Sequence, residues 1–413
     1  MEIAIIGGGA SGMMAALAAK QQDKKSTVII YEKNDRVGKK ILMTGNGKCN
    51  FSNMDFRPEY FRSDSTKNLQ CFFDAFGVQE TLEFFEEQGL LVKNRNGYLY
   101  PASEQAATIL DILRFACERA GVEIKTEAEV KRIVKKNDGF LVDAKVEKKH
   151  FDRVILACGS KAGPKNMTSG SGYLLAKSMG HQVIEPTPAL VQLRCMEDFF
   201  KQIAGVRTEC ELTLFVDGKI SQQERGELQL TDYGISGIPV FQFSRYAARA
   251  LKERKSVKVS MNFLPDFSEE SYEAFVHNRF EKKKGQSAEC FFLGITNKKI
   301  MQLFLKLAGV KPDEKIEAGN REKWEKVFLL LRDFQVQVKE SNPFENAQVS
   351  AGGICMDEVS ENLESLLVPG LFFAGELLDV DGRCGGYNLQ WAWTSGYLAG
   401  RAAFGVSNIV NGF

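Results

Sequence analysis

The chain has 413 residues, more than one ordinary hydrophobic core supports, so two or three domains are expected. Hydrophobic residues make up 44% and charged residues 26%, and 54 basic against 53 acidic side chains leave a formal net charge of +1. This is the composition of a globular protein, and the lack of a basic excess or stripe argues against a nucleic-acid partner.

The cysteine, histidine and hydropathy patterns limit the metal, redox and membrane roles that this chain can have. The nine cysteines include no CxxC or CxxxxC spacing, and only three histidines accompany them. We therefore predict no metal site, and the scattered cysteines fit a reducing cytosol. The N-terminus opens into a strand without a signal peptide, and the apolar run 7–19 is too short and glycine-rich to cross a bilayer. We expect a cytoplasmic protein with no membrane partner.

A dinucleotide fingerprint opens the chain. Residues 2–6 read as a buried parallel strand, and Gly7-x-Gly9-x-x-Gly12 separates it from a run of helix formers at 13–19. Gly7 would permit the tight turn, Gly9 would let the backbone approach a pyrophosphate, and Gly12 would let helix and strand pack closely. The free N–H groups of the helix N-terminus would then face the phosphates.

An acidic residue follows at the expected distance. The strand 26–31 ends in Glu32, about 20 residues after the last glycine, where a carboxylate suits an adenosine ribose. Strand, glycines, helix, strand and acid in this order predict a dinucleotide site. The acid argues against a ribose 2′-phosphate and leaves NAD and FAD both open.

Three further segments favour non-covalent FAD. Residues 34–53 combine glycines, cations and small amides, and their N–H groups would wrap an anionic ligand with Lys39 or Lys40 against the pyrophosphate, although a flexible basic loop is the alternative. The strand 151–156 runs into Ala157-Cys158-Gly159, which suits close approach to the adenine half. Near the C-terminus, the strand 370–374 and the glycine pair Gly385-Gly386 precede a second helix, whose N-terminus suits the N1–C2=O edge of a reduced flavin.

These motifs resemble one family. The stretches GGGASGMMAA, GKKILMTGNGKCNFSN, AGGICMDEV and GLFFAGELLDVDGRCGGYNLQWAWTSGYLAG are similar to the BaiN-like, or aminoacetone-oxidase-type, flavoproteins, whose FAD domain is related to that of glutathione reductase. The resemblance spans essentially the whole chain. It implies the following cofactor contacts: Gly7, Gly9, Ala10, Ser11, Gly12, Glu32, Lys33, Gly38, Lys39, Lys40, Thr44, Gly45, Asn50, Val130, Ala157, Gly159, Gly375, Glu376, Gly386, Asn388, Leu389 and Gln390.

The predicted fold class is α/β. A Rossmann-like FAD-binding domain, 1–190 with 345–413, is interrupted by a β-rich, barrel-like domain, 191–267 with 332–344. A helical subdomain, 268–331, is nested inside that insert, although its patterning fits a free-standing bundle equally well. The partial motif Gly170-Ser171-Gly172 follows no buried strand, so a dedicated NAD(P)H domain is not predicted.

The sequence offers few catalytic helpers. Arg383 could bind a carboxylate or enolate and Tyr387 could donate a proton, but a surface cation and a packing aromatic are equal alternatives. Cys49 and Cys384 are better explained by small-residue packing, and His181 by a helix end. No general base is predicted.

The predicted function is that of an FAD-dependent oxidoreductase acting on a small organic substrate. The resemblance implies that hydride passes through the flavin in an enone-type reduction, with NAD(P)H as the candidate donor. The alternatives are an aminoacetone-type amine oxidase that uses O₂, an FAD-dependent RNA-modifying enzyme, and a flavin-binding protein without turnover.

Overall fold

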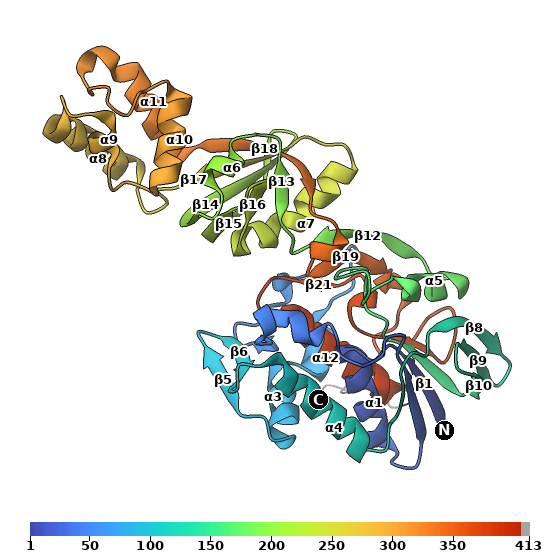
Figure 1. Cartoon of the computed structure of the whole chain (residues 1–413). Helices are drawn as coiled ribbons and strands as arrows, with labels where there is room; N and C mark the ends of the chain where they lie inside the picture. The colour runs from blue at the N-terminus through green and yellow to red at the C-terminus, as the bar shows by residue number, and fades with distance from the viewer. Residues whose placement is uncertain (406–413) are drawn as a thin grey trace. The chain divides into compact units, whose positions relative to one another are not determined.

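The computed structural model describes residues 1–405, so the last eight residues of the predicted FAD domain, 406–413, lie outside the described residues. The chain divides into two compact units, Met1–Thr187 with Gln348–Phe413, and Pro188–Ala347 (Figure 1). Each unit has its own hydrophobic core. The predicted Rossmann-type α/β fold with a barrel-like insert is confirmed.

The first unit is built on a five-stranded parallel sheet in the order β20-β11-β1-β2-β7. Ile6 pairs with Tyr31 on one side and Leu156 on the other, and Leu156 pairs with Phe373. A strand from near the end of the sequence therefore extends the sheet that the first residues begin. Its strands are β1 (Glu2–Ile6), β2 (Thr27–Tyr31), β7 (Glu123–Lys125), β11 (Arg153–Leu156) and β20 (Leu371–Phe373).

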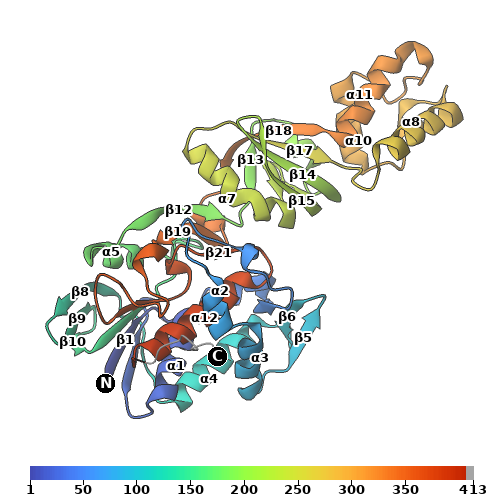
Figure 2. The same ribbon diagram turned by 180° about the vertical axis from the view of Figure 1, so that it is seen from behind.

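Two helices from opposite ends of the sequence pack against each other beside this sheet. Helix α1 (Ala10–Gln22) and helix α12 (Tyr387–Ala402) lie side by side in both views (Figures 1 and 2). A Cβ at Gly396 would lie 2.4 Å from the Ser11 carbonyl oxygen, and one at Gly400 would lie 2.2 Å from that of Ala15. Neither position has room for a side chain, so glycine at both lets the two helix backbones approach closely. This packing brings both helix N-termini to one region of the unit.

Smaller sheets and helices complete the first unit. The other sheets of this unit are β10-β9-β8, β3-β6-β5, β12-β19 and β4-β21. Their strands are β3 (Ser52–Asn53), β4 (Phe61–Arg62), β5 (Val92–Arg95), β6 (Tyr98–Pro101), β8 (Val130–Lys136), β9 (Gly139–Ala144), β10 (Lys148–Phe151), β12 (Val183–Ala189), β19 (Val349–Ile354) and β21 (Asp381–Gly382). The remaining helices are α2 (Gln70–Ala75), α3 (Val78–Glu87), α4 (Ala106–Arg119) and α5 (Ser171–Ser178), with short 3₁₀ segments that include η1 (Ile41–Gly47) and η6 (Gly375–Leu377).

The second unit contains a closed barrel in the order β13-β16-β15-β14-β17-β18. Its strands are β13 (Leu193–Cys195), β14 (Arg207–Val216), β15 (Lys219–Leu230), β16 (Gly234–Ser236), β17 (Val257–Asn262) and β18 (Phe334–Ser341). Its helices are α6 (Phe200–Ile203), α7 (Ile238–Lys252), α8 (Glu269–Lys283), α9 (Ala288–Phe292), α10 (Lys298–Ala308) and α11 (Arg321–Arg332). The ring of Phe304 in α10 lies 4.8 Å from that of Phe334 in β18, so the helical segment shares its apolar core with the barrel.

Candidate cofactor site

The first glycine loop has an open side that faces away from the protein core. A Cβ at Gly7 would lie 2.4 Å from the Ala157 carbonyl oxygen, and one at Gly12 would lie 1.9 Å from the Gly7 carbonyl oxygen. A Cβ at Gly9, by contrast, would meet no atom of residues 1–405 within 4 Å. Helix α1 starts directly after Gly9, and its first intrahelical hydrogen bond is donated by Met13 N. The earlier N–H groups point out of the helix at the open side, where an anion is stabilised.

The Glu32 carboxylate is fixed against this loop. The side chain is buried; its Oε2 accepts a 2.9 Å hydrogen bond from Gly8 N, and its Oε1 accepts bonds of 2.8 and 2.6 Å from the backbone and side-chain nitrogens of Asn34. A carboxylate has about four acceptor positions, so capacity for a ribose hydroxyl remains. Burial lowers the pKa of the neighbouring Lys33.

The loop after Glu32, residues 34–53, is tied to the C-terminal part of the chain. Lys40 Nζ lies 2.5 Å from Glu376 Oε2, and the other Glu376 oxygen accepts a 3.0 Å bond from Ser350 N. Lys39 forms an ion pair with Asp35. Of the two cations proposed for the pyrophosphate, Lys40 is therefore the one that links the loop 34–53 to the short segment η6, which contains Glu376.

The second glycine loop, Gly385-Gly386, places the N-terminus of α12 against the end of the loop 34–53. Gly386 caps α12 with a φ of +97°, and a Cβ there would lie 2.5 Å from the Ser52 carbonyl oxygen and 2.9 Å from Asn50 Oδ1. Asn50 Oδ1 is buried and has no hydrogen-bond partner within residues 1–405. A buried amide oxygen without a donor is costly unless a ligand supplies one. The N–H of an isoalloxazine ring is a donor of the required kind, so these residues fit a flavin.

Several residues predicted to contact the cofactor have their polar groups engaged within the protein. Asn388 uses its amide on the backbone of its own loop, accepting from Gly382 N and donating to the carbonyls of Gly382 and Arg383. Gln390 is buried, accepts from Ser52 Oγ and donates to several core oxygens. These two side chains shape the loop, and their role as direct ligands stays a prediction.

The other residues predicted to contact the cofactor lie in several different local environments. Gly38 packs on α4, because a Cβ there would lie 2.2 Å from Leu110 Cδ1. Thr44 donates its hydroxyl to the Ile41 carbonyl at 2.6 Å, and Gly45 adopts a φ of +55°. Val130 opens β8. The remaining predicted contacts lie at the end of an element or in a loop that borders the two glycine loops: Ala10, Ser11, Ala157, Gly159, Gly375 and Leu389.

The two catalytic candidates have different environments. Tyr387 is buried, its hydroxyl donates to the Asp55 carbonyl at 2.8 Å, and burial raises its pKa. This arrangement supports the packing interpretation of Tyr387. The Arg383 guanidinium lies 5.3 Å from the centre of the Tyr60 ring and is partly exposed. Burial raises the pKa of the Cys384 thiol to about 11, so it stays protonated at neutral pH.

Sequence reasoning missed a buried hydrogen-bond network in the first unit. His181 Nδ1 lies 3.0 Å from Glu358 Oε2, and His181 Nε2 lies 2.8 Å from Ser365 Oγ. Ser365 Oγ also accepts bonds from Leu367 N and Val368 N. The network joins segments far apart in the sequence, so no local sequence pattern could predict it. Within residues 1–405, no cluster of three or more His, Cys, Asp or Glu side chains is arranged to hold a metal ion.

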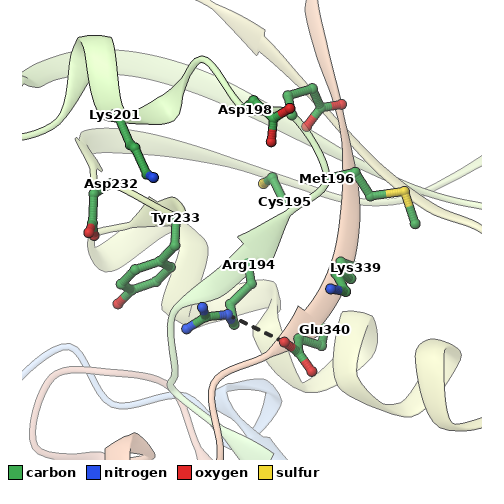
Figure 3. A pocket seen from close by; sticks show the side chains of 10 residues that line it. Arg194, Cys195, Met196, Asp198, Lys201, Asp232, Tyr233, Lys339 and Glu340 are labelled. Atoms are coloured by element: carbon green, nitrogen blue, oxygen red, sulfur yellow. Dashed lines mark ion pairs between the residues drawn. The ribbon is translucent and has the colours of Figure 1, made fainter.

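A separate hollow of about 620 Å³ lies within the second unit, beside β13 and β18. Figure 3 shows Lys201 and Asp198 directed into it, and the Arg194 guanidinium paired with Glu340. Its lining mixes cations and carboxylates and includes none of the predicted cofactor residues: Arg194, Cys195, Met196, Glu197, Asp198, Lys201, Asp232, Tyr233, Lys339 and Glu340. It is therefore distinct from the cofactor site of the first unit.

Comparison with known proteins identifies the family. The model of the HI0933-like protein Rossmann domain matches residues 1–402. The chain belongs to this family. It is 42% identical to the 3-dehydro-bile acid delta(4,6)-reductase of Clostridium scindens, over 97% of this chain and 98% of that protein. It is 28% identical to the ribosomal RNA dihydrouridine synthase of Escherichia coli, over 90% of each chain. The resemblance inferred from the motifs is confirmed, and the protein is an FAD-dependent oxidoreductase.

Solved structures show a more distant similarity. The open conformation of a flavocytochrome c3 fumarate reductase aligns with a TM-score of 0.49 and 15% identity, over 97% of this chain and 78% of that one. The 3-ketosteroid delta1-dehydrogenase of Sterolibacterium denitrificans aligns with a TM-score of 0.48 and 11% identity, over 97% and 98%. Separately, none of the helices within residues 1–405 has both the length and the apolar character needed to cross a membrane.

Proposed function

We propose that this protein reduces a carbon–carbon double bond conjugated to a carbonyl group in a small organic substrate, with NAD(P)H as the electron donor. Support comes from the relative that is 42% identical, whose name describes the reduction of double bonds in a 3-dehydro-bile acid. The name of the dihydrouridine synthase also describes the saturation of a ring double bond. The two relatives thus share one type of chemistry on different substrates.

The first unit would hold FAD with its two glycine loops. The N-terminus of α1 beside Gly9 would bind the pyrophosphate, Glu32 would bind the adenosine ribose, and Lys40 would add a cation. When bound, FAD would supply hydride transfer. The N-terminus of α12 would stabilise negative charge on the ring, and the Asn50 amide oxygen would accept a ring N–H. The unpartnered, buried Asn50 Oδ1 beside this helix end is the structural observation that carries the flavin assignment, and the 42% identical relative carries the reaction type.

The test is anaerobic photoreduction of the purified holoprotein, followed by separate mixing with a 3-oxo-Δ4,6 bile acid, NAD(P)⁺ or O₂. We expect rapid reoxidation by the dienone, and slower reoxidation by O₂. Recovery of yellow colour only with O₂ would instead indicate an oxidase. A protein that carries FMN, or no flavin, would contradict the cofactor assignment.

Reduction of a uracil ring in RNA is the second candidate. Two relatives, from Escherichia coli and Haemophilus influenzae, are ribosomal RNA dihydrouridine synthases, at 28% and 27% identity. The balanced net charge weighs against it, because RNA affinity generally depends on a basic surface. Salt-dependent binding of a uridine-containing RNA, with formation of dihydrouridine, would establish this candidate.

We also place the protein in the cytoplasm. Within residues 1–405 none of the nine cysteines forms a disulfide, which is typical of a reducing compartment. Labelling of thiols in intact cells and in lysates would test this placement.

A further inference from the structure

One face of the small sheet β3-β6-β5 carries aromatic, amide and cationic side chains. The strand register pairs Tyr98 with Asn53 on one side and with Arg95 on the other, and pairs Tyr100 with Lys93. Directly paired residues, and residues two apart on a strand, share a face of a sheet. These five residues therefore form a single surface, which we call the recognition face. Tyr98 is 37% exposed.

The recognition face touches the loops assigned to the redox end of the cofactor site. A Cβ at Gly385 would lie 3.0 Å from the Tyr98 ring, and Asn53 Nδ2 donates a 2.9 Å hydrogen bond to the Gly385 carbonyl. On the other side, a Cβ at Gly45 would lie 3.8 Å from the Tyr100 ring. Both tyrosine rings thus lie beside glycine loops that would border the flavin.

The outer end of the recognition face carries an excess of positive charge. Lys93, Arg95 and the nearby Lys48 all form ion pairs with Glu104, at 2.5 Å for Lys93 and 3.5 Å for Lys48. The hydrogen bond from Lys93, aided by Arg95, lowers the pKa of Glu104 to about 2, so this carboxylate stays ionised at neutral pH. The three cationic side chains and the single Glu104 carboxylate carry a net charge of +2, which is available to bind another anion.

We propose that the recognition face binds the substrate, and that it selects a planar conjugated molecule carrying one anionic group. Such a molecule would lie against Tyr98 and Tyr100 with its double bond toward the glycine loops, and its anion would reach Lys93 and Arg95. The compact cation cluster suits one carboxylate, whereas an RNA backbone needs cations spread along a stripe. This inference rests on the proposed function and names the substrate class for the same site.

The test uses full-length, FAD-loaded protein and two ligands, a 3-oxo-Δ4,6 bile acid and its methyl ester. Binding is measured from the change in flavin absorbance and by calorimetry, so turnover is not needed. In the variant Lys93→Gln/Arg95→Gln, binding of the acid should weaken about tenfold while binding of the ester stays the same. Tyr98→Leu should weaken the acid and the ester equally, by roughly threefold to tenfold.

A matched control removes the same charge elsewhere in the first unit. Arg132 and Lys148 lie on the sheet β10-β9-β8, and Lys148 is well exposed beside Asp143. Arg132→Gln/Lys148→Gln should leave the binding of both ligands unchanged. Flavin content and melting temperature, measured for every variant, show that each one is folded.

Three results would overturn the recognition face. One is equal binding of acid and ester by the unmodified protein, or no binding of the acid. Another is equal weakening of the acid in the control variant. The third is loss of affinity for a uridine RNA in Lys93→Gln/Arg95→Gln without acid–ester discrimination, which would make this face an RNA interface. If the acid binds with the expected discrimination but does not reoxidise the reduced flavin, the reductase proposal fails and the recognition face stands.

Discussion

Valine at position 9 should separate cofactor binding from folding. A Cβ at Gly9 meets no atom of residues 1–405 within 4 Å, and the backbone there, with φ −84° and ψ −165°, is extended. Gly9 is the N-cap of α1, where valine is less favourable than glycine, so Gly9→Val should lower the unfolding free energy of the apoprotein by only about 1 kcal/mol. The valine would fill the space that the pyrophosphate needs. Loss of two charge-assisted hydrogen bonds to the α1 N-terminus would cost roughly 3–6 kcal/mol, a hundredfold to ten-thousandfold in affinity.

The assay combines FAD titration of the apoprotein with thermal melts with and without FAD. Ligand stabilisation of about 2.7 kcal/mol, expected for unmodified protein at 100 times the dissociation constant, should vanish in Gly9→Val. Gly12→Val is the contrasting variant, since its Cβ would lie 1.9 Å from the Gly7 carbonyl oxygen and the chain should not fold. Normal FAD affinity in Gly9→Val would refute the phosphate site, and an unfolded apoprotein would refute the reading of Gly9 as an open position.

Other parts of the first unit give further predictions. Glu32→Ala should weaken FAD binding by about 1–3 kcal/mol, measured by titration, because one buried charged acceptor is lost. Asn50→Leu should weaken FAD binding without destabilising the apoprotein, since Oδ1 has no partner within residues 1–405; lower apoprotein stability would argue against a ligand role. Deletion of 370–413 should abolish FAD binding, because β20 and α12 leave with it; a soluble truncated protein that binds FAD would contradict the site. Burial lowers the pKa of His181 below 6.5. The stability that the neutral imidazole contributes is therefore present above pH 6.5 and is lost as the pH falls. The melting temperature should drop between pH 7.5 and pH 5.5, and it should drop less in His181→Gln.

The local parts of the cofactor site could be predicted because short-range sterics determine them. A strand, three glycines at fixed spacing, a helix and an acidic residue form one supersecondary unit, so the positive φ of Gly7 and the close approach of Gly12 to the Gly7 carbonyl follow from adjacent residues. The alternation of strands and helices likewise indicated an α/β domain with a β-rich insert. Three further segments then favoured FAD over NAD, and the family resemblance implied the same cofactor.

Tertiary contacts alone decided how the distant segments meet. Lys40 and Glu376 are 336 residues apart, and nothing in either local pattern selects this ion pair over the one that Lys39 makes with Asp35. Nor does the local sequence show that the Gln390 amide donates its hydrogen bonds to core oxygens, or that Asn50 Oδ1 receives no hydrogen bond from a protein donor within residues 1–405. Hydrogen-bond capacity belongs to a side chain, but the partner that satisfies it is set by the packing of the whole unit. For this reason the sequence indicated that a flavin binds, and the tertiary structure determined which atoms are available to hold it.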